Sequence, residues 1–231
     1  MPSPRTREQV HAAVDDVRSR IARTAERAGR DPASVRLVAA GKSVGAQSLG
    51  WALERGVTDI GENYVKELAA KRATLGGATW HFIGTLQSHT AHRVAELSDV
   101  VQTVTPGRAF SRLAARAVRS GSALPVLIEV DLTGGRSGLD PDGVVAFADE
   151  VATTEGVRLL GLMTVPEVPQ APEDARPSFR RLRELGERVV GRHPGAGELS
   201  MGMSLDYEVA IEEGATIVRI GTGLFGPRSP A

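Results

Sequence analysis

The chain has 231 residues, with 28 basic and 28 acidic side chains and no cysteine. Balanced charge indicates neither a nucleic acid nor a membrane surface as a partner, and the lack of cysteine excludes disulfides, thiolate catalysis and cysteine-ligated metal centres. An apolar fraction of 41% is enough for a folded core. The polar N-terminal segment and the lack of a long apolar run predict a cytoplasmic location.

The first predicted element is a long amphipathic helix that precedes any strand. Thr6 and Gln9 have the spacing of a capping box, and Gly29 is a typical helix stop. Between them, apolar residues recur at helical spacing: Val10, Ala13, Val14, Val17, Ile21, Ala25 and Ala28. We expect this extra N-terminal helix to cover the outer wall of the domain.

Short apolar runs then alternate with helical segments. The predicted strands are residues 35–40, 57–60, 79–83, 100–103, 125–131, 157–163, 198–201 and 215–220. The predicted helices between them are residues 46–55, 64–75, 88–97, 108–119, 141–153, 175–191 and 205–213, with a long loop over 166–177. Eight runs without polar alternation predict a parallel sheet covered on both faces. The count favours a single (β/α)₈ TIM barrel of the α/β class over 1–231, rather than an open doubly wound sheet.

Two basic residues stand where the active site of such a barrel lies, at the carboxyl ends of the strands. Lys42 follows the first strand, where desolvation favours a neutral amine that can form an imine with an aldehyde. A lysine that simply reaches solvent is the ordinary alternative. Arg219 interrupts the last strand, and a buried guanidinium requires either a carboxylate of the barrel or an acceptor group of a ligand.

A glycine-rich segment follows the last strand. Residues 221–226, GTGLFG, match GxGxxG, but too few residues follow for the ribose-binding unit of a dinucleotide fold. As the loop after the eighth strand, its N–H groups and the Thr222 hydroxyl are suited to a phosphate, together with residues 200–204 after the seventh strand.

Three histidines lie near one another in the sequence, at His81, His89 and His92. No carboxylate pattern beside them completes a recognised ligand set, so we expect no metal site. His81 lies within the third predicted strand and is expected to face the barrel interior.

Four segments carry a family resemblance: 37–43 (LVAAGKS), 61–65 (GENYV), 80–88 (WHFIGTLQS) and 199–226 (LSMGMSLDYEVAIEEGATIVRIGTGLFG). They extend over nearly the whole chain, in the order found in pyridoxal phosphate homeostasis proteins, and the sequence resembles that family. The resemblance implies an alanine-racemase-like (β/α)₈ barrel without the racemase's second, β-rich domain. It also implies pyridoxal 5'-phosphate (PLP) as the cofactor.

The resemblance further implies roles for single residues. The lysine that forms the Schiff base with PLP falls on Lys42, and the arginine that faces the pyridine nitrogen falls on Arg219. The remaining implied cofactor contacts are the phosphate ligands and the residues near the ring, namely Ser200, Gly202, Gly221, Thr222, Asn63, Met163 and Met201.

The sequence departs from the family pattern at several positions. Gly41 stands where the family has serine before the lysine, and His89 and Thr90 replace an asparagine–lysine pair. Asp131 replaces an asparagine, and Arg136 stands roughly where the family has another lysine. A glycine at position 41 loosens the backbone and removes a hydroxyl, so we expect PLP affinity or exchange to differ. An arginine cannot form an imine, so secondary attachment of the cofactor at Arg136 is not expected.

The implied arginine bears on function. An arginine donor leaves the pyridine nitrogen unprotonated and weakens the ring as an electron sink. We therefore expect a PLP-holding protein of vitamin B6 homeostasis that buffers PLP or delivers it to apo-enzymes. A lone barrel without the racemase's second domain is expected to be a monomer. One alternative is a weak PLP-dependent amino-acid racemase. Another is a lysine-dependent aldolase-type barrel for a sugar phosphate, which Arg219 and the GENYV segment disfavour.

Overall fold

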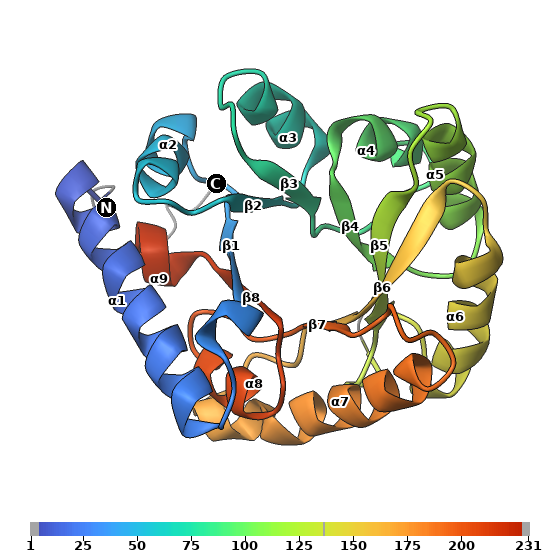
Figure 1. Cartoon of the computed structure of the whole chain (residues 1–231). Helices are drawn as coiled ribbons and strands as arrows, with labels where there is room; N and C mark the ends of the chain where they lie inside the picture. The colour runs from blue at the N-terminus through green and yellow to red at the C-terminus, as the bar shows by residue number, and fades with distance from the viewer. Residues whose placement is uncertain (1–4, 136, 228–231) are drawn as a thin grey trace.

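Eight parallel strands close into a barrel in the computed structural model, which describes residues 5–135 and 137–227 (Figure 1). Strand β1 pairs with β8 and closes the sheet, with Val38 opposite Arg219 and Ala39 opposite Ile220. The closed order confirms the barrel and excludes the open doubly wound sheet. The strands are β1 (Arg36–Ala40), β2 (Asp59–Glu62), β3 (Thr79–Phe82), β4 (Val100–Val104), β5 (Leu124–Val130), β6 (Val157–Thr164), β7 (Glu198–Ser200) and β8 (Ile217–Ile220).

A ring of helices surrounds the barrel (Figure 1). The seven predicted between the strands are present as α2 (Ala46–Glu54), α3 (Val65–Arg72), α4 (Ala91–Leu97), α5 (Arg108–Val118), α6 (Val144–Thr153), α7 (Arg176–Val190) and α8 (Tyr207–Glu212). A further short helix, α9 (Thr222–Phe225), forms inside the glycine-rich segment and was not predicted, because glycine is a poor helix former. Single 3₁₀ turns precede β1, α6 and α7, at Pro32–Ser34, Pro141–Gly143 and Pro172–Ala175.

The N-terminal helix α1 (Arg7–Arg27) is present as predicted. The Thr6 hydroxyl accepts from the Gln9 N–H, and the Gln9 side chain accepts in return from the Thr6 N–H, which completes the capping box. Its apolar face is buried against α2, α8 and α9 on the outer wall (Figure 1). Arg5 adds a polar anchor, because its guanidinium donates to the carbonyls of Gly223 and Leu224 at 2.7 and 2.8 Å.

Two packed regions make the core. The larger lies between the barrel wall and the helices. The smaller fills the barrel interior with Val38, Val100, Leu127, Met163 and Ile217. Side chains therefore occupy the inside of the barrel, as in other barrels of this size.

The loop predicted over 166–177 is shorter in the structure. Irregular backbone follows β6 up to the 3₁₀ turn Pro172–Ala175, and α7 already begins at Arg176. Pro177 therefore lies in the first helical turn, where its missing N–H costs nothing. None of the helices formed by the described residues is long and apolar enough to cross a membrane.

Candidate functional site

A cavity of about 680 Å³ opens at the carboxyl ends of the strands. Loops after β1, β2, β3, β6, β7 and β8 surround it. Its lining residues are Ala40, Lys42, Asn63, Ile83, Val165, Val168, Pro169, Met203, Ser204, Leu205, Asp206, Arg219, Gly221 and Thr222. A few polar groups converge there among apolar side chains, which is the usual composition of a small-molecule site.

Lys42 supplies the amine of this cavity. Its Nζ lies 5.4 Å from the centre of the Tyr64 ring, and Tyr64 is half exposed. The sequence contains only two other lysines. Lys66 is exposed on α3, and Lys71 donates to three oxygens inside the structure. Lys42 is thus the lysine placed to meet a ligand in the cavity.

A buried ion cluster holds the turn that carries Lys42. Lys71 Nζ donates to the Gly41 carbonyl at 2.8 Å, to Glu62 Oε1 at 2.6 Å and to Glu67 Oε2 at 2.7 Å. The same Glu67 oxygen accepts from the Ser43 N–H at 3.1 Å. Ser43 has φ +60°, a left-handed conformation that costs free energy for a residue other than glycine. The Lys71 cluster therefore stabilises a strained turn directly after Lys42.

The cluster also accounts for Gly41, one of the departures from the family pattern. A Cβ at this position would lie 2.5 Å from Glu62 Oε1. Glu62 is fully buried, and burial raises the pKa of its carboxyl despite the bond from Lys71. Because Lys71 pins Glu62 in place, a side chain at position 41 would have to displace the cluster.

Arg219 lies at the floor of the cavity and is 3% exposed. Its guanidinium donates to Ser200 Oγ at 2.6 Å and to the Thr164 carbonyl at 2.8 Å, both uncharged acceptors. Burial lowers the pKa of Arg219 to about 10, and the carboxyls of Glu129 and Asp206 oppose that shift. The remaining N–H groups of the guanidinium are available to an acceptor in the cavity.

Hydroxyl and N–H groups gather at another part of the wall. Gly221 and Thr222 line the cavity at the start of α9, where the first N–H groups of a helix have no intrahelical partner. Ser204 Oγ accepts from the Gly223 N–H at 3.0 Å and fixes the loop after β7 to the loop after β8. These groups can hold an anionic oxygen.

Asp206 is a buried polar residue of the same wall, 1% exposed. Its Oδ1 accepts from the Met203 N–H at 2.6 Å, whereas Oδ2 has no partner among the described residues. Burial raises the pKa of this carboxyl. An orphaned buried oxygen beside a cavity is typical of a site that accepts a polar ligand.

The predicted site residues divide into two groups. Lys42, Asn63, Arg219, Gly221 and Thr222 line the cavity. The other four are buried and are not among its lining residues. The Ser200 hydroxyl accepts from the Arg219 guanidinium, and the Gly202 carbonyl accepts from the Arg219 backbone N–H. Met163 packs in the barrel interior, and Met201 packs in the core between the barrel wall and the helices. Direct contacts of these four with a cofactor stay predictions.

Sequence reasoning left several lining residues unassigned to the cofactor. Ser204 belongs to the segment 200–204 that was predicted to help hold a phosphate, and it lines the cavity. Asp206 lies two residues beyond that segment, so its place after the seventh strand was the available signal. Val168 and Leu205 are exposed apolar residues at the mouth, and no pattern in their loops marked them.

The remaining candidates lie away from the cavity. His89 and His92 are exposed, and Thr90 precedes the first turn of α4. His81 is fully buried inside the barrel, as predicted. Residues 5–135 and 137–227 contain no group of three His, Cys, Asp or Glu side chains placed to hold a metal. Arg136 lies outside the described residues.

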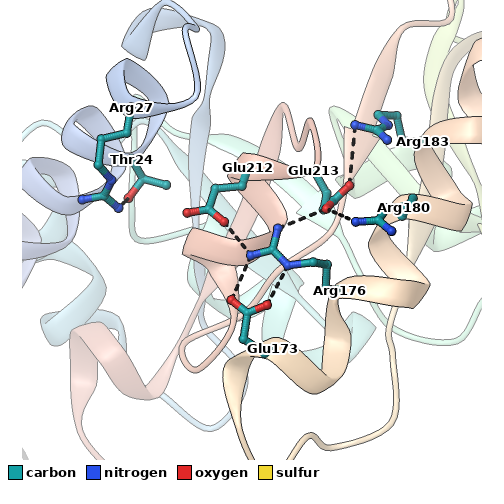
Figure 2. Close-up of polar contacts among 8 residues, drawn as sticks. All are labelled: Thr24, Arg27, Glu173, Arg176, Arg180, Arg183, Glu212 and Glu213. Atoms are coloured by element: carbon teal, nitrogen blue, oxygen red, sulfur yellow. Dashed lines mark hydrogen bonds and ion pairs between the residues drawn. The ribbon is translucent and has the colours of Figure 1, made fainter.

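An ion-pair cluster joins α7 and α8 outside the cavity. Figure 2 shows Arg176, at the start of α7, bonded to Glu173, Glu212 and Glu213 at 2.6, 2.6 and 3.0 Å. Glu213 also pairs with two further arginines of α7. The cluster joins the start of α7 and the 3₁₀ turn before it to the C-terminal end of α8.

The comparisons with known proteins agree with this geometry. Residues 13–229 match the alanine racemase N-terminal domain. Two curated relatives are both named pyridoxal phosphate homeostasis protein. The one from Pseudomonas aeruginosa is 40% identical over 93% of this chain and 94% of its own. The one from Aquifex aeolicus is 38% identical over 92% of this chain and 95% of its own.

Solved structures show the same fold. A Bifidobacterium adolescentis protein superposes with a TM-score of 0.88, at 32% identity over 95% of each chain. PipY of Synechococcus elongatus, solved with PLP bound, has a TM-score of 0.78 at 32% identity, over 89% of this chain and all of that one. The D-threonine aldolase of Filomicrobium marinum, at 16% identity and a TM-score of 0.78, shares the fold alone. The chain therefore belongs to the family of pyridoxal phosphate homeostasis proteins, which are built on the alanine racemase N-terminal domain.

Proposed function

We propose that this chain binds PLP as a Schiff base on Lys42 and takes part in PLP homeostasis, by holding the cofactor and releasing it to other proteins. The observation that carries the proposal is the convergence of Lys42, Arg219 and the Gly221–Thr222 segment on one cavity. A relative at 32% identity has been solved with PLP bound.

The groups around the cavity fit the chemistry of PLP. Lys42 offers an amine to the aldehyde, and Arg219 offers N–H donors to the pyridine nitrogen. The N–H groups at Gly221 and Thr222, with the hydroxyls of Thr222 and Ser204, suit the phosphate. PLP, when bound, supplies a reactive aldehyde and an electron-withdrawing ring. An arginine donor leaves the ring nitrogen unprotonated, which favours holding the cofactor over fast amino-acid chemistry.

The experiment is the absorbance spectrum of the purified protein with and without added PLP, followed by borohydride reduction and mapping of the modified lysine. We expect a Schiff-base band and a reduced adduct on Lys42. Lys42→Ala removes both. Lys66→Ala is the matched control, because Lys66 is the exposed lysine of α3, and it retains both.

Two outcomes would contradict the proposal. The first is a parent protein that shows no band with excess PLP, and the second is an adduct that maps to Lys66 or Lys71. An adduct that forms only with a sugar phosphate would instead identify an aldolase-type barrel.

The homeostasis role requires its own test. PLP-loaded protein is mixed with an apo PLP-dependent enzyme while a phosphatase consumes free PLP. Activation of the acceptor under these conditions supports delivery, and no activation limits the protein to storage. Interconversion of D- and L-alanine by the loaded protein, lost in Lys42→Ala, would favour the alternative of a weak amino-acid racemase.

A further inference from the structure

A continuous chain of hydrogen bonds crosses the barrel interior beneath the cavity. It runs through one residue from each of five strands, namely Asp59, His81, Gln102, Ser200 and Arg219. The successive donor–acceptor distances are 2.8, 2.8, 2.6 and 2.6 Å. Each of these residues is at most 6% exposed. A buried polar series of this length is costly unless every member is paired.

The chemistry of the members fixes the direction of every bond. A guanidinium only donates, so Ser200 Oγ accepts from Arg219 and gives its own proton to Gln102 Oε1. The Gln102 amide nitrogen then donates to His81 Nδ1, which must carry a lone pair. The His81 ring proton therefore lies on Nε2, where it donates to Asp59.

The hydrogen-bond series ends, on the side away from Arg219, at the carboxylate of Asp59. Burial alone would raise the pKa of Asp59, but hydrogen bonds from His81 and Thr58 outweigh it and lower the pKa. Asp59 also lies 3.9 Å from the guanidinium of Arg36, which is partly exposed at the opposite end of the barrel from the cavity. The bonds therefore all point one way, from the cationic Arg219 to the anionic Asp59, with a neutral His81 between them.

The reverse orientation of Gln102 is unfavourable. Its amide nitrogen would then face Ser200 Oγ, and the Ser200 proton would lose its acceptor, because Arg219 has none to offer. His81 Nδ1 would also have to carry a proton to meet the Gln102 oxygen, which would place an imidazolium inside the barrel. The hydrogen-bond series therefore allows one orientation for each of its side chains.

We propose that Asp59, His81, Gln102 and Ser200 form a positioning relay that fixes the guanidinium of Arg219 towards the cavity, and so sets how firmly Arg219 holds the ring nitrogen of bound PLP. The inference rests on the proposed function for its ligand. The relay itself belongs to the unloaded protein. Residues two and three side chains away from the guanidinium accordingly control the cofactor without touching it.

The test breaks the relay in its middle. Gln102→Leu removes both bonds of a residue that does not line the cavity. Thr103→Val is the matched control, because Thr103 is the next residue on β4, is equally buried and bonds instead to the Gly84 carbonyl. Asp59→Asn is the conservative variant, since its amide oxygen can still accept from His81.

The first readout uses the unloaded protein. Long-range ¹H–¹⁵N spectra are expected to show His81 protonated on Nε2 alone, and slowly exchanging guanidinium protons on Arg219. Gln102→Leu should speed that exchange, whereas Thr103→Val and Asp59→Asn should leave it slow. An Nδ1-protonated His81, or unchanged Arg219 exchange in Gln102→Leu, overturns the relay whether or not the protein binds PLP.

The second readout uses the PLP-loaded protein. Gln102→Leu is expected to keep the reduced adduct on Lys42, to shift the absorbance maximum and to weaken PLP binding about tenfold, the equivalent of one buried hydrogen bond. Equal spectra and affinities in Gln102→Leu and Thr103→Val would show that the relay does not reach the cofactor. A parent without an adduct would contradict the proposed function and, with it, the relay's effect on PLP.

Discussion

Replacing Lys71 by methionine is expected to destabilise the protein by about 3–5 kcal/mol at pH 8, the usual cost of leaving a buried charge without its partner. The substitution keeps a long side chain and removes the ammonium that donates to Gly41, Glu62 and Glu67. Glu62 is fully buried, so water cannot replace the lost donor. For a chain of this size, the loss corresponds to a fall in Tm of roughly 10 °C.

The loss should be smaller in acid. Burial already raises the pKa of Glu62, and removal of the Lys71 charge raises it further. A carboxyl whose pKa is higher in the folded state binds a proton preferentially there. Its contribution to stability is therefore complete below its unfolded pKa and is lost as the pH rises through the folded pKa. Lys71→Met should consequently be closer to the parent at pH 5 than at pH 8.

Urea unfolding followed by circular dichroism at both pH values measures these differences. The double variant Glu62→Gln/Lys71→Met removes both buried charges and should recover most of the lost stability. Lys66→Met, on the exposed side of α3, is the control and should match the parent. The reasoning is refuted if the double variant is as unstable as Lys71→Met, or if the loss is the same at both pH values.

Three further predictions concern stability. Gly41→Ala should lower Tm, because its Cβ meets Glu62, whereas Gly45→Ala, with nothing within 4 Å, should leave Tm unchanged in a thermal melt. Burial raises the pKa of Glu213, but hydrogen bonds from neighbouring arginines lower this pKa overall. Its contribution is therefore present above the unfolded carboxyl pKa and is lost as the pH falls through the folded value, so Glu213→Gln should flatten the acid side of the stability curve. Phe110→Ala should cost about 3–5 kcal/mol in urea unfolding, since the ring is buried edge-on against Phe147. A loss below that of Phe110→Leu would contradict the packing argument.

Much of the fold could be predicted from sequence because the strands are covered on both faces. Their apolar runs lack the regular polar alternation of half-exposed strands and are separated by amphipathic helices, so all eight strands and the helices between them could be located. The short helix α9 could not be located in this way, because the low helix propensity of glycine favours a loop. The segment is helical in the folded protein, where the Arg5 guanidinium donates to two of its carbonyls.

The sequence could indicate the site wherever a charged residue occupies a position that is normally apolar. A lysine directly after a buried strand and an arginine within one both stand out, and both line the cavity. The contact of Ser200 with a phosphate stays a prediction, whereas the bonds of its hydroxyl to Gln102 and Arg219 inside the barrel were not foreseen. That partnership joins residues 98 and 19 positions apart, and no local pattern carries it.

The pairing of β1 with β8 has a consequence for synthesis of the protein. Lys42 follows the first strand of the barrel and Arg219 lies on the eighth, so neighbouring parts of one cavity come from strands far apart in the sequence. A nascent chain on the ribosome can pair β1 through β7 in order but cannot complete the cavity before β8 emerges. A ligand that needs both residues can therefore bind only after β8 has paired with β1, so its binding reports that the barrel has closed.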